Sequence, residues 1–117
     1  MPKTPRDHLP LKQAHYLILL ALTEGDMHGY AIKKAVAART DGAVRLGAGS
    51  LYRSIAQLQE WGLIAASTWR PAPRLDDERR AYLAITALGR RVAGAETDRL
   101  ASLVAHARAA GLGGNAG

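Results

Sequence analysis

The sequence predicts a mainly α-helical protein with a small β-hairpin in its second half and one long helix at its C-terminal end. Apolar residues recur at helical spacing through most of the chain, and a period of two appears only near residues 80–85. Phe is absent, and there are two Trp and four Tyr. The core must therefore come from aliphatic residues and Ala, which favours closely packed helices. The length of 117 residues suits a single domain.

The chain should begin with a flexible arm over residues 1–9, which are rich in charge and contain two prolines. A first helix is predicted over residues 10–22. Its main apolar face consists of Leu11, Ala14, Leu17, Ile18, Ala21 and Leu22. Leu19 and Leu20 widen this face, so the helix is apolar almost all round and should lie at the centre of the core.

A second helix is predicted from about His28 to Arg39, after a break at residues 23–26. Its apolar side consists of Tyr30, Ile32 and Val36, and its outward side carries Lys33, Lys34 and Arg39. His28 suits a packing or capping role at the start of this helix. Residues 40–43 have the composition of a turn.

The third predicted helix covers residues 48–61, has Gly47 as its N-cap and ends at Gly62. Its two faces differ in polarity. The apolar face consists of Leu51, Ile55 and Leu58. The polar face consists of Ser50, Arg53 and Gln57, with Tyr52 on its flank. Side chains of these polar types can reach base edges and phosphates, although a solvated amphipathic helix would show the same pattern.

Two strands are predicted around a loop over residues 71–79. The first follows Gly62 over residues 63–70, and the second covers residues 80–85. The second alternates in polarity, which predicts one buried face. Two strands around such a loop form a hairpin of the kind called a wing.

The last predicted helix begins after Thr86, a good N-cap, and continues to Ala110. Its apolar stripe consists of Leu88, Val92, Ala95, Leu100, Leu103, Val104 and Ala107. A helix of this length exposes more apolar surface than one small domain can cover, which predicts a partner helix. Residues 111–117 should form a flexible tail.

The charge of the chain favours a polyanionic partner. The net charge is +6 and the pI is about 10.2. Arg supplies most of the positive charge. Its guanidinium can form two parallel hydrogen bonds with a phosphate or with guanine. Basic proteins with other partners are common, so charge supports this prediction without establishing it.

Several function classes are excluded or disfavoured. There is no Cys, which excludes disulfides, thiol catalysis and thiolate metal sites. The four His have no metal-ligand spacing, and no nucleophile stands beside a base. We therefore expect no enzyme, no cofactor and no metal site. We also find no signal peptide and no membrane-spanning run, and expect a cytoplasmic protein.

In order, these elements form a winged helix-turn-helix domain over residues 10–85 and a dimerisation helix over residues 86–110. The sequence also resembles the PadR-like family of transcriptional regulators, in its short form with one C-terminal helix. The resemblance covers roughly residues 11–105. The matching blocks are Ile18–Gly25, Met27–Ile32, Gly49–Tyr52, Leu58 with Gly62–Ile64, and Tyr82–Thr86 with Gly89. Each block is weak alone, but together at family spacing they are specific.

The resemblance implies a homodimer that binds double-stranded DNA and usually represses transcription. The third helix of each protomer would enter a major groove, and the wing would lie along a minor groove or the backbone. A small aromatic effector often releases DNA in this family. By position, Ser50, Tyr52 and Arg53 match the family's recognition contacts, and Gln57 is added from the helical wheel alone.

This chain departs from the family pattern at several positions. Gly47-Ala48 replaces a common Ser/Thr-Pro, Arg53 replaces a common Pro, and Ala84 replaces a common Arg or Lys. We expect the extra cation at position 53 to give this protein its own choice of operator. The wing also carries the acids Asp76, Asp77 and Glu78, which phosphate would repel.

The wing contains or adjoins four arginines, namely Arg70, Arg74, Arg79 and Arg80. One interpretation is a solvated hairpin with local Arg–Asp pairs, each worth about 0–1 kcal/mol. We favour the alternative that at least two of them contact phosphates, while residues 76–78 hold the wing tip off the duplex.

The long helix has no aromatic residue, so any effector site would have to use Trp61 or Trp69, although packing is the more common role for such residues. The leading interpretation is a dimeric repressor that binds an inverted-repeat operator and is released by a small molecule. The alternative is a winged-helix module that binds protein and not DNA.

Overall fold

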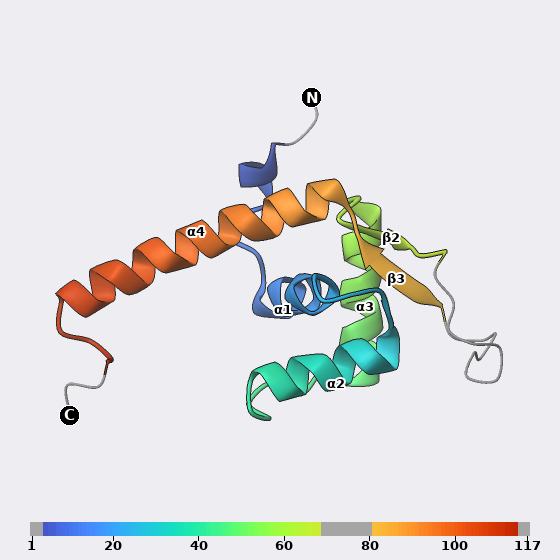
Figure 1. Cartoon of the computed structure of the whole chain (residues 1–117), viewed down its shortest axis with the longest axis horizontal. Helices are drawn as coiled ribbons and strands as arrows, with labels where there is room; N and C mark the ends of the chain where they lie inside the picture. The colour runs from blue at the N-terminus through green and yellow to red at the C-terminus, as the bar shows by residue number, and fades with distance from the viewer. Residues whose placement is uncertain (1–3, 69–80, 115–117) are drawn as a thin grey trace.

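The computed structural model of this chain describes residues 4–68 and 81–114. The elements follow in the order η1 (Pro5–His8), α1 (Gln13–Leu22), β1 (Met27–His28), α2 (Gly29–Arg39), α3 (Ala48–Glu60), β2 (Ile64–Ala66), β3 (Tyr82–Ile85) and α4 (Ala87–Ala109) (Figure 1). This order confirms the predicted mainly helical class with a small antiparallel sheet and a long last helix. The predicted wing loop lies outside the described residues.

Helix α1 is central, as its apolar sequence predicted. Ile18, Leu19 and Leu22 expose at most 1% of their surface, and α1 packs against α2, α3 and α4. Figure 1 shows it between α4 and α2. The helix begins at Gln13 and not at residue 10, because Lys12 is extended and serves as its N-cap.

The predicted N-terminal arm contains a short 3-10 helix, η1, which lies against α4. The Asp7 carboxylate accepts a hydrogen bond from the Thr4 amide at 2.8 Å. Leu9 packs against the core, and the Leu11 amide donates to the Glu96 carboxylate of α4 at 3.2 Å. A single turn is too short to show helical periodicity, so the sequence did not reveal it.

Helix α2 begins after His28, whose Nδ1 accepts a hydrogen bond from the Ala31 amide at 3.2 Å. This confirms a capping role for His28. Ile32 and Val36 are fully buried, but Tyr30 is 57% exposed. The prediction that Tyr30 lies on the apolar side is therefore wrong. Tyr30 precedes Ile32 by two residues, which places it roughly 200° away around the helix.

The sheet has three antiparallel strands in the order β1-β3-β2. Leu83 is aligned with Met27 on one side and with Ala66 on the other. Both Tyr82 and Leu83 are buried, at 7% and 5% exposure, so the prediction of a strand with one buried face is wrong. The physical reason is that both faces are covered by side chains, because Leu83 packs in the core and the Tyr82 ring packs edge-on against His28 at a centroid distance of 5.3 Å.

Helix α4 begins where the sequence predicted, because Thr86 Oγ1 accepts a hydrogen bond from the Gly89 amide at 2.9 Å. A side chain at Gly89 would overlap the Leu63 carbonyl oxygen, so only glycine allows this close approach. Val92 and Ala93 are buried. Beyond residue 100 the helix extends away from the other helices (Figure 1). In the described part of the chain, no helix is long and apolar enough to cross a membrane.

Candidate nucleic-acid interface

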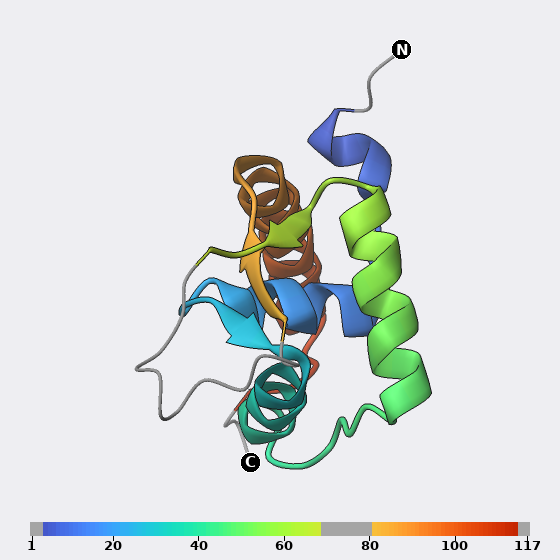
Figure 2. The same cartoon turned by 90° about the vertical axis from the view of Figure 1, so that its right-hand side faces the viewer.

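Helix α3 lies along one side of the molecule, and its first turn is close to the level of α2 (Figure 2). One face is fixed in the core by Leu51, Ile55 and Leu58, which are 2%, 5% and 0% exposed. The predicted polar side is open at its N-terminal end, where Ser50 and Arg53 are exposed. The helix therefore combines a rigidly held face with an accessible face, which is the arrangement that groove recognition requires.

Ser50 and Arg53 are close together on α3. Arg53 Nη2 donates to Ser50 Oγ at 3.5 Å, so the hydrogen bond is long. The guanidinium lies back along the first turn, 3.7 Å from where a side chain at Gly49 would begin. The structure thus brings Ser50 and Arg53 together in the first half of the helix, and within the described residues Arg53 makes only this long hydrogen bond.

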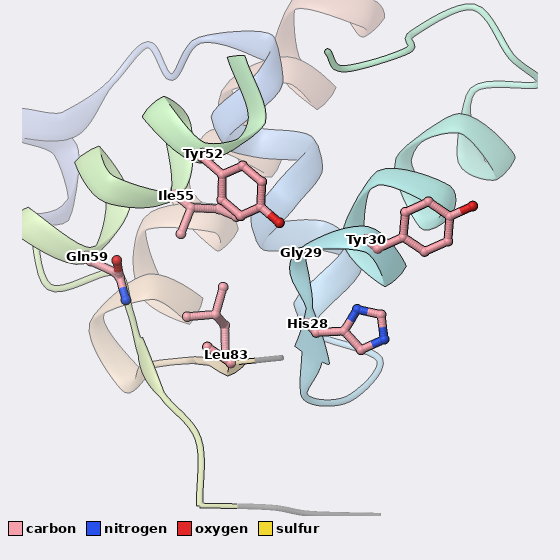
Figure 3. Close-up of a pocket in the computed structure, with 8 residues that line it drawn as sticks. His28, Gly29, Tyr30, Tyr52, Ile55, Gln59 and Leu83 are labelled. Carbon is pink, nitrogen blue, oxygen red and sulfur yellow. The ribbon is translucent and has the colours of Figure 1, made fainter. Parts of the chain in front are cut away.

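Tyr52 projects from α3 toward the start of α2 (Figure 3). It is 58% exposed, and its hydroxyl would lie 2.9 Å from a Cβ at Gly29. A pocket of about 400 Å³ opens between α2, α3 and β3, with Ile55 and Leu83 among its lining residues. Gly29 therefore leaves the space in which the Tyr52 ring rests, and Tyr52 connects the surfaces of α2 and α3.

Gln57 is not part of the Ser50–Arg53 cluster. It is half-buried, and its Oε1 forms a hydrogen bond of 2.9 Å with His15 Nε2. Burial lowers the pKa of His15 below 6.5, partly offset by the hydrogen bond with Gln57, and Lys12 lowers it further. A neutral His15 that donates from Nε2 fits this environment. The amide of Gln57 is thus already engaged inside the protein, and its predicted DNA contact stays untested.

Trp61 is the C-cap of α3 and is half-buried. Its ring meets His15 edge-on at a centroid distance of 5.1 Å and lies 6.1 Å from His8. These contacts give Trp61 a packing role between α1, α3 and the N-terminal turn. Trp69, the predicted wing arginines (Arg70, Arg74, Arg79 and Arg80) and the acids at 76–78 lie outside the described residues.

A second exposed surface, which was not predicted from the sequence, lies on α2 and the loop before α3. It is a hollow of about 450 Å³, lined by Tyr30, Lys33, Lys34, Ala37, Arg45, Leu46 and Gly47. The signal was available, because Tyr30, Lys33, Lys34 and Ala37 follow the i, i+3, i+4, i+7 spacing of one helix face. The sequence pattern alone does not reveal the hollow, because it predicts Tyr30 on the apolar side and cannot show that Arg45 lies beside the helix.

The far half of α4 carries exposed apolar side chains. Leu103 and Val104 are 53% and 49% exposed, and Leu100 and Ala107 are partly exposed. Nearer the body of the protein, Glu96 is 2% exposed and accepts hydrogen bonds from Arg99 Nε and Nη2 at 2.5 and 2.9 Å. Bonding to Arg99 lowers the pKa of Glu96 despite its burial. The apolar stripe predicted for α4 is thus partly buried at its start and open at its end.

The described residues contain no group of three or more His, Cys, Asp or Glu that could hold a metal ion. The surface instead presents polar and basic side chains on α3, whose opposite face packs in the core. Three helices and a small antiparallel sheet, with one face of the third helix exposed, define a winged helix-turn-helix protein. The chain belongs to the transcriptional regulator PadR-like family, whose sequence model matches residues 18–95. This confirms the resemblance.

Solved structures of other proteins share the fold. A transcriptional regulator from Clostridium thermocellum is 26% identical, with a TM-score of 0.64, over 84% of this chain and 87% of that chain. A PadR family regulator from Clostridium difficile is 20% identical, with a TM-score of 0.69. The match covers 83% of this chain and 96% of that chain. A PadR-like regulator from Bacillus cereus is 18% identical, with a TM-score of 0.69. The match covers 86% of this chain and 92% of that chain. No protein of curated function matches this chain.

Proposed function

We propose that this protein is a homodimeric, sequence-specific DNA-binding repressor. The observation that carries the proposal is the first half of α3, where Ser50, Tyr52 and Arg53 are exposed on a helix whose opposite face is buried. Membership of a family of transcriptional regulators supports it, as does the net charge of +6. A polyanionic partner is attracted by such a charge.

In this proposal α3 enters the major groove of double-stranded DNA, and its first two turns contact base edges. Arg53 has the reach and the paired donors for guanine O6 and N7. Ser50 and Tyr52 supply shorter hydroxyl contacts to bases or phosphates. Arg70, Arg74, Arg79 and Arg80 of the wing would add phosphate contacts on the flank.

The dimer in this proposal forms through α4, whose exposed Leu103 and Val104 need a covering partner. A second copy of the same helix offers a matching apolar stripe. Two recognition helices related by a two-fold axis would lie about 34–36 Å apart. The operator should therefore be an inverted repeat.

Release of DNA by a small aromatic effector is the part of the proposal that comes from the family alone. Trp61 and Trp69 remain its candidate contacts. The contacts of Trp61 with His8 and His15 favour packing for that residue. If an effector binds beside Trp61, the change in the surroundings of the indole should appear in the tryptophan fluorescence.

The test is binding of the full chain to the DNA upstream of its own coding region, compared with a random duplex of equal length, by fluorescence anisotropy. The proposal predicts tighter binding to the upstream fragment and repression of a reporter placed behind it. No binding to either DNA at low salt would overturn it and favour a protein-binding module. Equal affinity for both DNAs would contradict sequence specificity.

Two further experiments test separate parts of the proposal. Replacing Leu103 and Val104 with Glu should convert a dimer into a monomer in sedimentation equilibrium, whereas Glu replacements at the exposed Ala101 and Ser102 serve as controls. Replacing Asp76, Asp77 and Glu78 with Ala should tighten non-specific binding and steepen its salt dependence. An unchanged slope would show that the acids do not hold the wing off the duplex.

A further inference from the structure

The pocket between α2, α3 and β3, which we call the sheet-side pocket, has an apolar floor and a polar rim (Figure 3). Ile55 and Leu83 form the floor, and each exposes only 5% of its surface. Tyr52 and Gln59 stand at the rim and are exposed. The volume of about 400 Å³ and this mixture of apolar walls with a few polar groups are typical of a small-molecule site.

Small residues keep the sheet-side pocket open. Gly29 has no side chain, and a Cβ there would lie 2.9 Å from the Tyr52 hydroxyl oxygen and 3.1 Å from the ring. Ala81, just before β3, brings only a methyl group to the lining. Tyr52, Ile55 and Gln59 follow the i, i+3, i+7 spacing of one helix face, so a single face of α3 forms one wall.

The described residues that line the sheet-side pocket carry no charge. Nδ1 of His28 accepts a hydrogen bond from the Ala31 amide, so that nitrogen carries no proton and the ring is neutral. The hollow on the other part of α2 differs, because Lys33, Lys34 and Arg45 line it. An anion would be drawn to that hollow, whereas the sheet-side pocket favours a molecule that gives up no charge hydration on entering it.

The rim of the sheet-side pocket offers hydrogen-bonding groups of both kinds. The Gln59 side-chain amide has donors and an acceptor, and the Tyr52 hydroxyl can donate or accept. Within residues 4–68 and 81–114, neither group forms a hydrogen bond with another residue. A ligand with a donor beside an acceptor would match Gln59, and a flat ring would pack against the Tyr52 ring and the apolar floor.

We propose that the sheet-side pocket binds a small, neutral aromatic compound that carries an amide or a similar edge with adjacent donor and acceptor. The ring packs on Tyr52 and the floor, and the amide edge forms hydrogen bonds with Gln59. This site is separate from an effector contact at Trp61, which does not line the pocket.

The consequence of this binding for regulation rests on the proposed function. Tyr52 lines the sheet-side pocket and is also one of the residues proposed to contact DNA. An occupied pocket holds the Tyr52 ring against the ligand and places foreign atoms beside the first half of α3. The compound and the duplex therefore compete for the same surface of each protomer.

The first experiment measures binding of benzamide to the full chain from the amide NMR signals of the isotope-labelled protein. The proposal predicts a Kd on the order of 1 mM, as for other compounds of this size. The signals of the Gly29 backbone amide and the Gln59 side-chain amide should shift. Benzoate and benzylammonium have the same ring with a charge, and each should bind at least about tenfold more weakly in this pocket.

Two variants with matched controls locate the site. Gly29→Ala adds a methyl group that pushes the Tyr52 hydroxyl aside, and Gln59→Leu removes the rim amide from an exposed position. Each should weaken benzamide binding by about fivefold or more. Gly94→Ala and Gln13→Leu make the same changes at exposed positions of α4 and α1, and both should keep the wild-type Kd. Equal thermal unfolding midpoints would show that Gln59→Leu leaves the fold intact.

The second experiment adds benzamide to the complex with the upstream fragment. At about ten times its Kd, a compound that excludes DNA should lower the apparent affinity about tenfold per protomer in fluorescence anisotropy. The loss should be smaller in Gln59→Leu at the same benzamide concentration, and unchanged in Gln13→Leu.

The outcomes separate this inference from the proposed function. If benzamide shifts no signal of the pocket residues, or binds Gln59→Leu as tightly as the wild type, the inference is overturned, while specific DNA binding would leave the proposed function standing. Benzoate binding as tight as that of benzamide would overturn the neutral ligand class. If benzamide binds in the pocket and the protein binds neither DNA, the site stands and the proposed function falls. Binding in the pocket with unchanged DNA affinity would overturn the competition.

Discussion

The two ends of α3 lie in different surroundings. At the N-terminal end, Ser50, Tyr52 and Arg53 face solvent, and Arg53 donates only a long hydrogen bond of 3.5 Å to Ser50 within the described residues. At the C-terminal end, Gln57 is bonded to a histidine that is 2% exposed, and Trp61 packs on the same ring. The difference indicates a helix that is held at one end and available for recognition at the other.

The largest expected contrast is between a buried and an exposed residue of this helix. Leu58 is fully buried, so Leu58→Ala should lower the free energy of unfolding by about 2–5 kcal/mol. Tyr52 is 58% exposed. Tyr52→Ala should therefore change the free energy of unfolding by no more than about 1 kcal/mol, while it weakens DNA binding. Urea unfolding at fixed protein concentration measures the first effect and anisotropy the second. Equal losses of stability would contradict the contrast.

A smaller loss is expected from the anchoring hydrogen bond. Gln57→Ala removes the partner of the buried His15 and should cost about 1–3 kcal/mol of unfolding free energy. If Gln57 anchors the helix, the preference for the upstream fragment over random DNA should remain. If Gln57→Ala instead kept normal stability and lost the preference for the upstream fragment, Gln57 would be a DNA contact.

The same anchor makes stability depend on pH. Because burial lowers the pKa of His15 below 6.5, the unfolded chain takes up a proton at a higher pH than the folded chain. This stabilising contribution is complete above about pH 6.5 and is lost as the pH falls toward the folded pKa. His15→Phe should flatten the unfolding free energy over that window. Unchanged pH dependence in His15→Phe would show that another group is responsible.

A second acid-sensitive contribution should appear at lower pH. The hydrogen bonds from Arg99 lower the pKa of Glu96 below 4.5. The stability they provide is present above about pH 4.5 and is lost as the pH falls below it. Glu96→Gln should remove the loss of stability below about pH 4.5 and leave the pH dependence caused by His15 unchanged. If Glu96→Gln also abolished the pH dependence caused by His15, the titrations of Glu96 and His15 would be coupled.

The sequence predicted the helices of this fold well. Apolar periodicity placed α3 almost to the residue, and the N-cap chemistry of Thr86 and Gly47 placed the starts of α4 and α3. Local signals of this kind depend on neighbours within a few positions. Features that depend on distant partners were missed. The clearest is the burial of both Tyr82 and Leu83, since β1 pairs with β3 across more than half of the domain.

The candidate interface was predicted in part. The exposed positions of Ser50, Tyr52 and Arg53 follow directly from the helical wheel of α3. Gln57 shares that wheel, but its environment is set by His15 of another helix, which no pattern within α3 could show. The hollow on α2 combines that helix with a loop residue, Arg45, so its cations converge only in three dimensions.

The proposed division of α3 is tested most directly by comparing Arg53→Ala and Gln57→Ala on the upstream fragment and on random DNA. The account predicts that Arg53→Ala loses about 1–3 kcal/mol of binding free energy on the upstream fragment and much less on random DNA. Gln57→Ala should retain the wild-type ratio of the two affinities. The account is contradicted if Arg53→Ala weakens both equally, which would leave Arg53 as a phosphate contact, or if only Gln57→Ala abolishes the preference.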